Sequence, residues 1–112
     1  MQAAQLDATF AALADPTRRA ILARLAEGDA LLKDLAAPFE ISLPAVGKHL
    51  KVLVVAGLVS RRRDAQRRPC HLEAGRLREA VDWLEEYRRF WDLRYEQLDS
   101  VLAAKDEGSP AD

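Results

Sequence analysis

Residues 41–69, ISLPAVGKHLKVLVVAGLVSRRRDAQRRP, are the stretch that decides the fold. Ser42 has the hydroxyl of a helix N-cap, and Pro44 lies in the first turn, where its missing N–H costs little. Gly57 supplies the left-handed residue at which a helix ends. This order predicts a helix over residues 42–56, followed by a short apolar strand and a cationic hairpin.

The apolar and the cationic side chains of this predicted helix separate onto different parts of its circumference. The apolar residues that recur at helical spacing, and that we expect to face inward, are Ala45 or Val46, Leu50, Leu53 and Val54. The basic residues that fall mostly elsewhere are Lys48, His49 and Lys51. A cationic helix joined to a cationic hairpin suits a groove lined by phosphates.

Upstream, the sequence predicts three shorter helices, over residues 5–14, 16–26 and 30–37. Asp15 is suited to cap the second helix, and Pro16 to occupy its first position. Gly28 ends the second helix and Pro38 the third. The residues that we expect to face the core from these helices are Leu6, Phe10, Leu13, Ile21, Leu22, Leu25, Leu31, Leu32 and Leu35.

Downstream of Gly57 the pattern changes from helix to hairpin and back to helix. Residues 58–63 and 69–72 are too short for helices and flank a polar turn at residues 64–68, so they predict an antiparallel hairpin. The turn contains no glycine, which leaves its geometry open. From about residue 74 to residue 104, apolar side chains at helical spacing predict one long helix.

The apolar stripe of this long helix is wide and rich in aromatic residues. Five of the seven aromatic residues in the chain fall on it, and aromatic side chains are enriched at association surfaces. We therefore expect a two-fold dimer, with the alternative that the stripe only completes the core of one chain. The residues expected at the dimer interface are Leu6, Phe10, Trp83, Tyr87, Phe90, Trp91, Tyr95 and Leu98.

Composition indicates one domain with a core: the chain has 112 residues, 49% of them apolar and 31% charged. No apolar run approaches the ~18 residues that cross a membrane, and the N-terminus lacks the pattern of a signal peptide. The single cysteine, Cys70, cannot form an intrachain disulfide, which favours a cytoplasmic location. We expect the domain to span residues 1–104 and a disordered tail to span residues 105–112.

Positive charge is gathered in one third of the chain, although the net charge is only −1. Residues 42–72 hold seven Lys or Arg and one Asp, a net charge of +6, while the other residues carry a net charge of −7. Such an asymmetry steers an anionic polymer toward one side of a protein. The alternative is that the basic segment is only a solvated charge run.

Two segments and the basic hairpin resemble the ArsR-type bacterial transcriptional regulators. The segments are LADPTRRAILARLAEG at residues 13–28 and LPAVGKHLKVLVVAGLV at residues 43–59, and the resemblance covers roughly residues 6–102. The phrases APFEISLPAV and WLEEYRRFW resemble a subgroup encoded beside START-like or activator-of-heat-shock-ATPase proteins. The resemblance implies a mainly helical winged helix-turn-helix with a small β-hairpin, a long C-terminal dimerisation helix, and repression by occupying an operator.

The resemblance also implies which residues approach DNA. In such proteins the fourth helix enters the major groove and the wing reaches the backbone or the adjacent minor groove. The implied groove residues are Ser42, Leu43, Ala45, Gly47, Lys48 and His49, with Lys51 one turn further on. The implied wing residues are Arg63, Arg67 and Arg68. Thr17 and Arg18 match positions near a phosphate, which the free N–H groups of a helix N-terminus can bind.

The sequence departs from the family pattern at three places, one of which is the turn before the recognition helix, where the usual glycine is missing, as in the APFEIS subgroup. Gly47 stands where members often carry serine, which removes a hydroxyl and costs about 1 kcal/mol of helix propensity relative to alanine. This departure relaxes base discrimination or lets the backbone approach DNA closely. Cys70 and His71 stand where the second wing strand commonly carries tyrosines.

Metal, redox and enzymatic chemistry find little support in the sequence. A transition-metal sensor needs three or four ligands, yet the predicted third helix has no cysteine and no histidine follows His71. We expect no metal and no cofactor. Nearby arginines could activate the thiol of Cys70, but the favoured interpretation is a small, half-buried strand residue beside a solvent-facing His71. No catalytic triad or phosphate-binding glycine loop is present, so we expect no enzyme.

The leading hypothesis is a homodimeric, sequence-specific DNA-binding repressor that acts on double-stranded operator DNA, with an inverted repeat expected. The alternative is a winged-helix interaction module that does not bind DNA, for which the +6 segment would be unnecessary. The operator sequence, the regulated genes, the direction of regulation and any small-molecule effector stay open at this stage.

Overall fold

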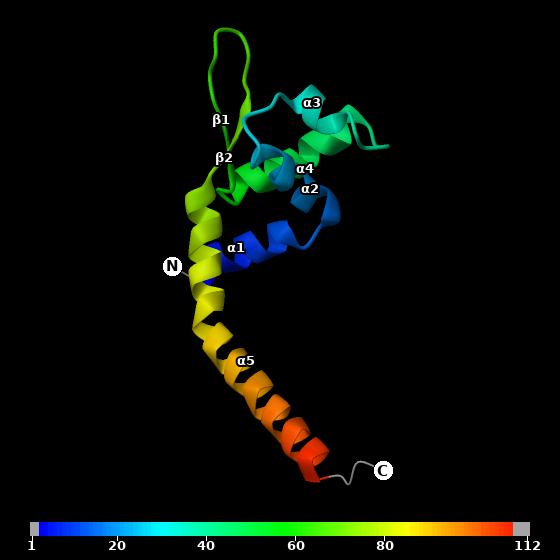
Figure 1. The fold of residues 1–112 in the computed structure, drawn as a ribbon. Coiled ribbons are helices and arrows are strands. Elements are labelled where there is room, and N and C mark those ends of the chain that lie inside the picture. The colour runs from blue at the N-terminus through cyan, green and yellow to red at the C-terminus, as the bar shows by residue number, and fades with distance from the viewer. Residues whose placement is uncertain (1–2, 109–112) are drawn as a thin grey trace. The chain divides into compact units, whose positions relative to one another are not determined.

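The computed structural model describes residues 3–108, without the side chains of Arg89, Trp91, Tyr95 and residues 104–108. Its elements are α1 (Ala3–Leu13), α2 (Pro16–Leu25), α3 (Leu32–Ala36), α4 (Leu43–Val55), β1 (Val59–Arg61), β2 (Cys70–Leu72) and α5 (Ala74–Gly108) (Figure 1). This confirms the predicted mainly helical fold with one antiparallel hairpin and a long C-terminal helix. The chain divides into two units between Ala80 and Val81, inside α5.

The first unit holds the hydrophobic core. Leu53 and Leu58 are fully buried, and Ile21 and Leu35 are 1% exposed. The other buried core residues are Ala12, Leu22, Leu25, Ala30, Val46, Leu50, Val59, Cys70 and Ala80. The predicted apolar faces of α2 and α4 are thus confirmed, except for Val54, which was predicted to face inward and is 37% exposed. It lies with Leu32 and Gly47 beside a shallow hollow at the margin of α4.

Polar contacts at the junction of α1 and α2 explain the sequence Asp-Pro-Thr-Arg-Arg. The Asp15 side chain accepts a hydrogen bond from the backbone N–H of Arg18 at 3.0 Å and thereby caps α2. The Arg19 guanidinium donates to the carbonyl oxygen of Leu13 at 2.8 Å. Since the last carbonyl groups of a helix have no partner inside it, cations here stabilise the end of α1.

The third helix begins later than predicted, at Leu32 rather than at residue 30. The reason is tertiary: Ala30 forms an antiparallel bridge with Cys70 of β2, and Leu31 is the extended N-cap of α3. An extended residue paired to a strand cannot be helical. Ala30 therefore adds a short third segment beside the two-stranded sheet.

The wing consists of residues 59–72. Its strands pair with Ser60 opposite His71 and Arg61 opposite Cys70. Beyond the strands, Asp64 and Arg67 exchange two backbone hydrogen bonds of 3.2 and 2.9 Å, which leaves a two-residue turn. Ala65 has a φ of 56° there, and a positive φ at only the first central residue is typical of a type II′ turn. This settles the turn geometry that the sequence left open.

The last helix, α5, extends to Gly108, four residues past its predicted end. The rest of the predicted tail, residues 109–112, lies outside the described residues. Leu77 and Ala80 pack within the first unit. Within residues 3–108, no helix is long and apolar enough to cross a membrane.

The second unit consists of the part of α5 from Val81 onward. The large apolar side chains that the structure describes here are exposed, and Leu84, Tyr87, Phe90 and Leu98 are all about half exposed. The rings of Trp83 and Tyr87 lie 5.0 Å apart between centroids. The Arg94 guanidinium lies 4.6 Å from the centroid of the Phe90 ring.

Candidate nucleic-acid interface

The N-terminal half of α4 combines a buried anchor with an exposed polar face. Ser42 caps the helix, since its Oγ accepts a hydrogen bond from the backbone N–H of Ala45 at 3.2 Å. Leu43 is 49% exposed, and the side chains of Lys48 and Lys51 are exposed. The fully buried Val46 and the buried Leu50 and Leu53 fix the rotation of the helix, and so they determine which side chains face outward.

Gly47 does not lie on the exposed face of α4. A Cβ built on it would lie 3.9 Å from Cδ2 of Leu32, which is an ordinary van der Waals contact with α3. Ala45 and Gly47 are both only partly exposed. Four of the residues predicted to contact DNA do lie on an accessible surface, namely Ser42, Leu43, Lys48 and Lys51. Gly47 is directed toward α3 instead.

Arg18 and His49 meet at the side of this face. Arg18 Nη1 lies 3.3 Å from His49 Nδ1, and Asp15 Oδ2 lies 3.7 Å from the same ring nitrogen. The Asp15 carboxylate accepts the backbone N–H of Arg18, and with the nearby cationic groups this holds the pKa of Asp15 below its ordinary value. Thr17 is half-buried in the first turn of α2. Sequence reasoning grouped Thr17 and Arg18 as residues near a phosphate and did not anticipate the contact with His49.

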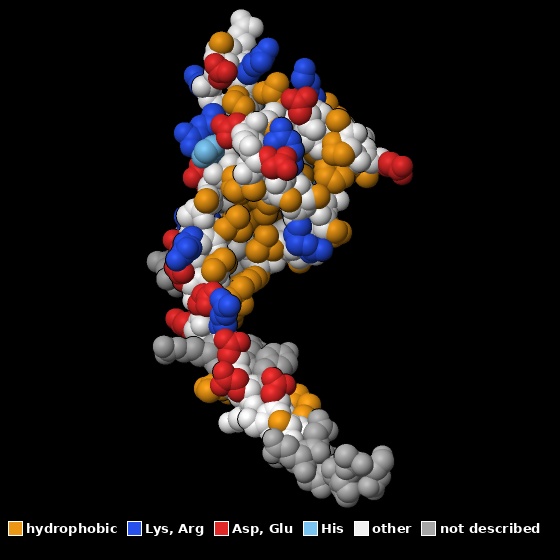
Figure 2. Space-filling model, in the orientation of Figure 1, with side chains coloured by type: hydrophobic (Ala, Val, Ile, Leu, Met, Phe, Trp, Pro, Cys, Tyr) orange, Lys and Arg blue, Asp and Glu red, His pale blue; other side chains and the backbone are white. Residues whose placement is uncertain are grey.

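The wing carries four exposed arginines within a few residues of one another. Arg62, Arg63, Arg67 and Arg68 are exposed, and Figure 2 shows blue Lys and Arg side chains around the hairpin at the top of the view. Arg61 was not predicted as a site residue. Its Nε and Nη2 donate to the carbonyl oxygen of Arg68 at 3.0 and 2.9 Å, so it braces one strand of the wing against the other.

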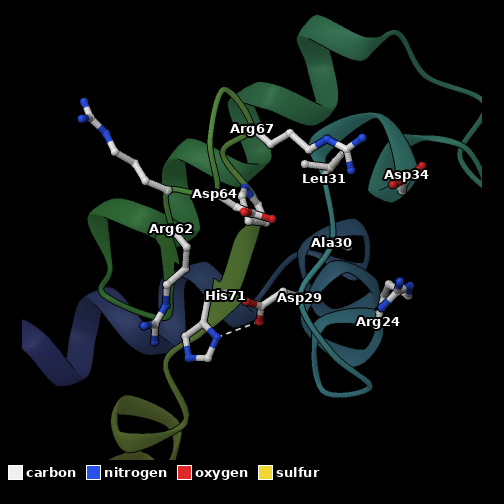
Figure 3. A pocket seen from close by; sticks show the side chains of 11 residues that line it. Arg24, Asp29, Ala30, Leu31, Asp34, Arg62, Asp64, Arg67 and His71 are labelled. Atoms are coloured by element: carbon white, nitrogen blue, oxygen red, sulfur yellow. Dashed lines mark hydrogen bonds and ion pairs between the residues drawn. The ribbon is translucent and has the colours of Figure 1, made fainter.

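A pocket of about 630 Å³ lies between the wing and the segment that leads into α3 (Figure 3). His71 Nδ1 lies 2.7 Å from Asp29 Oδ1 at its base. In Figure 3 the side chain of Arg67 extends across to Leu31, on the side of Asp34. The other residues that line the pocket are Arg24, Ala30, Arg62, Arg63, Asp64 and Pro69. The lining contains both arginines and aspartates, so the pocket lacks the uniformly positive charge of a simple anion-binding site.

Comparisons with known proteins agree with this geometry. A family model described as a helix-turn-helix domain matches residues 13–62. The chain is 44% identical over 85 residues to the HTH-type transcriptional regulator Rv2034 of Mycobacterium tuberculosis, which covers 76% of this chain and 77% of that protein. It is 37% identical over 75 residues to the transcriptional repressor SdpR of Bacillus subtilis, which covers 67% of this chain and 83% of that protein.

Solved structures extend the similarity to three dimensions. The crystal structure of the ArsR family transcriptional regulator RHA00566 matches with a TM-score of 0.71 and 39% identity, over 79% of this chain and 97% of that one. The protein belongs to the ArsR family. The NMR structure of the homodimeric winged helix-turn-helix DNA-binding domain Mb0332 from Mycobacterium bovis matches with a TM-score of 0.60 and 26% identity, over 75% of this chain and 81% of that one.

Membership of the ArsR family identifies the chain as a DNA-binding transcriptional regulator and not as an enzyme. α4 occupies the place of the recognition helix in this fold, and residues 59–72 form its wing. The resemblance stated from the motifs at residues 13–28 and 43–59 is thereby confirmed at the level of the family.

Cys70 of this ArsR-family protein is fully buried, so its predicted half-burial is wrong. Burial raises the pKa of the thiol above its ordinary value, and the opposing effect of Arg61 is smaller. A neutral, inaccessible thiol is a poor nucleophile and a poor metal ligand. In the portion of the chain that the structure describes, no three His, Cys, Asp or Glu side chains are grouped to hold a metal ion.

Proposed function

We propose that this protein is a homodimeric, sequence-specific repressor that inserts α4 into the major groove of operator DNA and lays its wing on the backbone or the adjacent minor groove. The observation that carries the proposal is the concentration of positive charge in α4 and the wing, with a net charge of +6 over residues 42–72. Phosphate neutralisation supplies affinity, and base contacts supply specificity. Repression is supported by the similarity to SdpR, which is named a transcriptional repressor.

Different residues have different roles in this proposal. Arg67 and Arg68, with Arg63, contact phosphates or the minor groove from the wing. Thr17 and Arg18 stand near a phosphate at the N-terminus of α2, although the backbone N–H of Arg18 already donates to the Asp15 carboxylate. The residues of α4 that approach the major groove are Ser42, Leu43, Ala45, Lys48, His49 and Lys51, whereas Gly47 faces α3.

Dimerisation uses the apolar stripe of α5. Tyr87 is 47% exposed and Leu98 is 53% exposed, and large apolar side chains at such exposure mark association surfaces. Trp83 and Phe90 contribute to the same stripe, whereas the side chains of Trp91 and Tyr95 lie outside the described residues. The half-buried Leu6 and Phe10 of α1 are proposed as further dimer contacts. The homodimeric state of Mb0332 supports this assignment.

Two copies would contact two half-sites about 34–36 Å apart, which favours an inverted repeat as operator. DNA binding and dimerisation then both reside in residues 1–104, and the protein acts in the cytoplasm. Because Cys70 is buried and the described residues offer no ligand cluster, we propose that regulation does not use a metal. The subgroup encoded beside START-like proteins is the finer assignment that the motif APFEISLPAV supports.

A fluorescence-anisotropy titration tests the proposal. The purified protein is titrated against its own upstream DNA and a scrambled duplex at two salt concentrations, while light scattering reports its mass. The expected result is that a dimer binds tightly and in a salt-dependent manner, with higher affinity for the upstream DNA than for the scrambled duplex. If neither duplex binds, and DNA selected from a random pool shows no enrichment, then the winged helix serves only protein interaction.

A further inference from the structure

The two histidines of the chain contact partners with opposite hydrogen-bonding capacity. His49 Nδ1 lies 3.3 Å from Nη1 of Arg18, and His71 Nδ1 lies 2.7 Å from Oδ1 of Asp29. A guanidinium can only donate hydrogen bonds, whereas a carboxylate can only accept them. The Asp15 carboxylate also lies near Nδ1 of His49, but at 3.7 Å its Oδ2 is beyond hydrogen-bond distance. In the neutral rings, Nδ1 of His49 therefore accepts from Arg18, and Nδ1 of His71 donates to Asp29. His49 then carries its proton on Nε2, and His71 carries its proton on Nδ1.

Arg18 is held firmly in the position from which it contacts His49. Its Nε donates to the carbonyl oxygen of Ala12 at 2.7 Å, and its Nη2 donates to the carbonyl oxygen of Ala11 at 3.0 Å. Its backbone N–H donates to the carboxylate of Asp15. Because the guanidinium is planar, two bonds to the end of α1 fix the direction of the third N–H group, which points at His49.

We propose that Arg18 is a positioning residue that holds the neutral ring of His49 in its Nε2–H tautomer, so that α4 presents a hydrogen-bond donor to DNA at this position. The part of the proposal that concerns DNA rests on the proposed function above. The sequence motif predicted Arg18 itself beside a phosphate, whereas its geometry assigns it an action through another side chain 31 residues away. The fixed tautomer is a property of the free protein.

An Nε2–H donor on α4 can form hydrogen bonds only with acceptor atoms of the DNA bases. In the major groove, the acceptors are N7 and O6 of guanine, N7 of adenine and O4 of thymine, whereas cytosine presents a donor amino group. An Nε2–H donor therefore favours an acceptor at the contacted position and disfavours cytosine. His49 is 26% exposed, which leaves part of the ring accessible while Nδ1 contacts Arg18.

Long-range ¹H–¹⁵N correlation spectra of the imidazole rings test the tautomer without DNA. The protein has two histidines, so a spectrum at about pH 8.5, above the range in which free imidazole binds a proton, contains two ring systems. The variant His71→Asn assigns them. We expect an Nε2–H pattern for His49 and an Nδ1–H pattern for His71. An Nδ1–H pattern or an even mixture for His49 in the unaltered protein would overturn the proposal.

Two neighbouring arginines provide a matched pair of variants. Arg18→Met removes the contact with Nδ1, so His49 should become a mixture of tautomers while His71 keeps its pattern. Arg19→Met removes a comparable hydrogen bond to the end of α1, on Leu13, but touches neither histidine. It controls for the loss of helix capping. If His49 keeps a pure Nε2–H pattern in a folded Arg18→Met variant, Arg18 does not position the ring.

Affinity measurements test the consequence of the fixed tautomer for DNA recognition. They use operator DNA that has been selected with the unaltered protein. Glutamine can present an amide donor near the place of Nε2, so His49→Gln should retain affinity within about threefold, whereas His49→Leu should lose about tenfold or more, mainly at one base pair. Arg18→Met should lose affinity and Arg19→Met should not. Equal losses for His49→Gln and His49→Leu would refute the donor role. If no DNA binds at all, the proposed function fails, while the tautomer result stands by itself.

Discussion

The backbone N–H of Cys70 donates to the carbonyl oxygen of Ala30 at 2.7 Å, and the N–H of Ala30 donates back to Cys70 at 3.2 Å. This pair of hydrogen bonds joins the second strand of the wing to the residue just before α3. It also places the side chain of Cys70 in the core, where it is fully buried. The wing is thus anchored to the helix-turn-helix at its base, while its turn at Ala65 and Gln66 is exposed.

We expect the thiol of Cys70 to be unreactive in the folded protein. DTNB should react at least about tenfold more slowly under native conditions than in urea, because burial excludes the reagent and raises the pKa of the thiol. The raised pKa means that folding favours the neutral thiol. This contribution to stability is complete below the ordinary pKa of 9.0 and is lost as the pH rises through the higher folded value. Native reactivity equal to that in urea would contradict the buried placement.

Asp15 should make stability depend on pH in the acid range. Its pKa is lowered, chiefly by the hydrogen bond from the Arg18 N–H, so its contribution is present above the ordinary value of 3.8 and is lost as the pH falls through the lower folded value. Asp15→Ala should lower the melting temperature at neutral pH, because the cap of α2 is removed. Asp15→Asn keeps a capping oxygen and should lose only the acid dependence. Identical pH profiles for the unaltered protein and Asp15→Asn would be evidence against this assignment.

Two glycines near α4 should respond in opposite ways to alanine. Gly47→Ala should stabilise the protein by up to about 1 kcal/mol, since it raises helix propensity and its methyl group meets only Leu32 at 3.9 Å. Gly57→Ala should destabilise it by about 1–2 kcal/mol, because Gly57 has a φ of +80° and its Cβ would lie 3.1 Å from Arg76. Urea unfolding measures both values. A destabilised Gly47→Ala would mean that α4 needs the flexibility of glycine.

The wing arginines should set the salt dependence of DNA binding. Replacing Arg67 and Arg68 by alanine should weaken specific and non-specific binding alike and reduce the slope of log K against log salt by about 2. Arg88→Ala removes an exposed arginine from α5, where it pairs with Glu85, and should leave the slope unchanged. Anisotropy titrations at several salt concentrations supply the slopes. An unchanged slope in the double wing variant would rule out these phosphate contacts.

Dimerisation should depend on one side of α5. Leu98→Glu places a charge on the apolar stripe and should weaken the dimer by about tenfold or more, since burying a leucine contributes roughly 1.5–3 kcal/mol. Leu93 is similarly exposed, at 57% against 53% for Leu98, but it lies about 140° away around the helix. Leu93→Glu is therefore the matched control and should remain dimeric. Light scattering over a dilution series distinguishes the two, and equal dissociation of both variants would argue against a one-sided interface.

The sequence by itself determined the elements whose signals are local. Asp15, Ser42 and Gly57 sit at helix ends as predicted, because a cap or a left-handed residue acts within a few positions along the chain. The core of α2 and α4 followed from apolar spacing, and the family followed from the motifs at residues 13–28 and 43–59. The basic surface was visible as a charge count, which needs no coordinates.

Only the tertiary structure determined which contacts form between residues that lie far apart in the sequence. Ala30 is extended because it pairs with Cys70, and the contact of Arg18 with His49 joins residues 31 apart. Gly47 is directed toward Leu32, although its position in the motif suggested the DNA face. Periodicity predicts one buried face of a helix, but it does not say which neighbour lies beside each margin of that face. Hydrogen-bond partners and orientations at those margins arise only when the helices pack together.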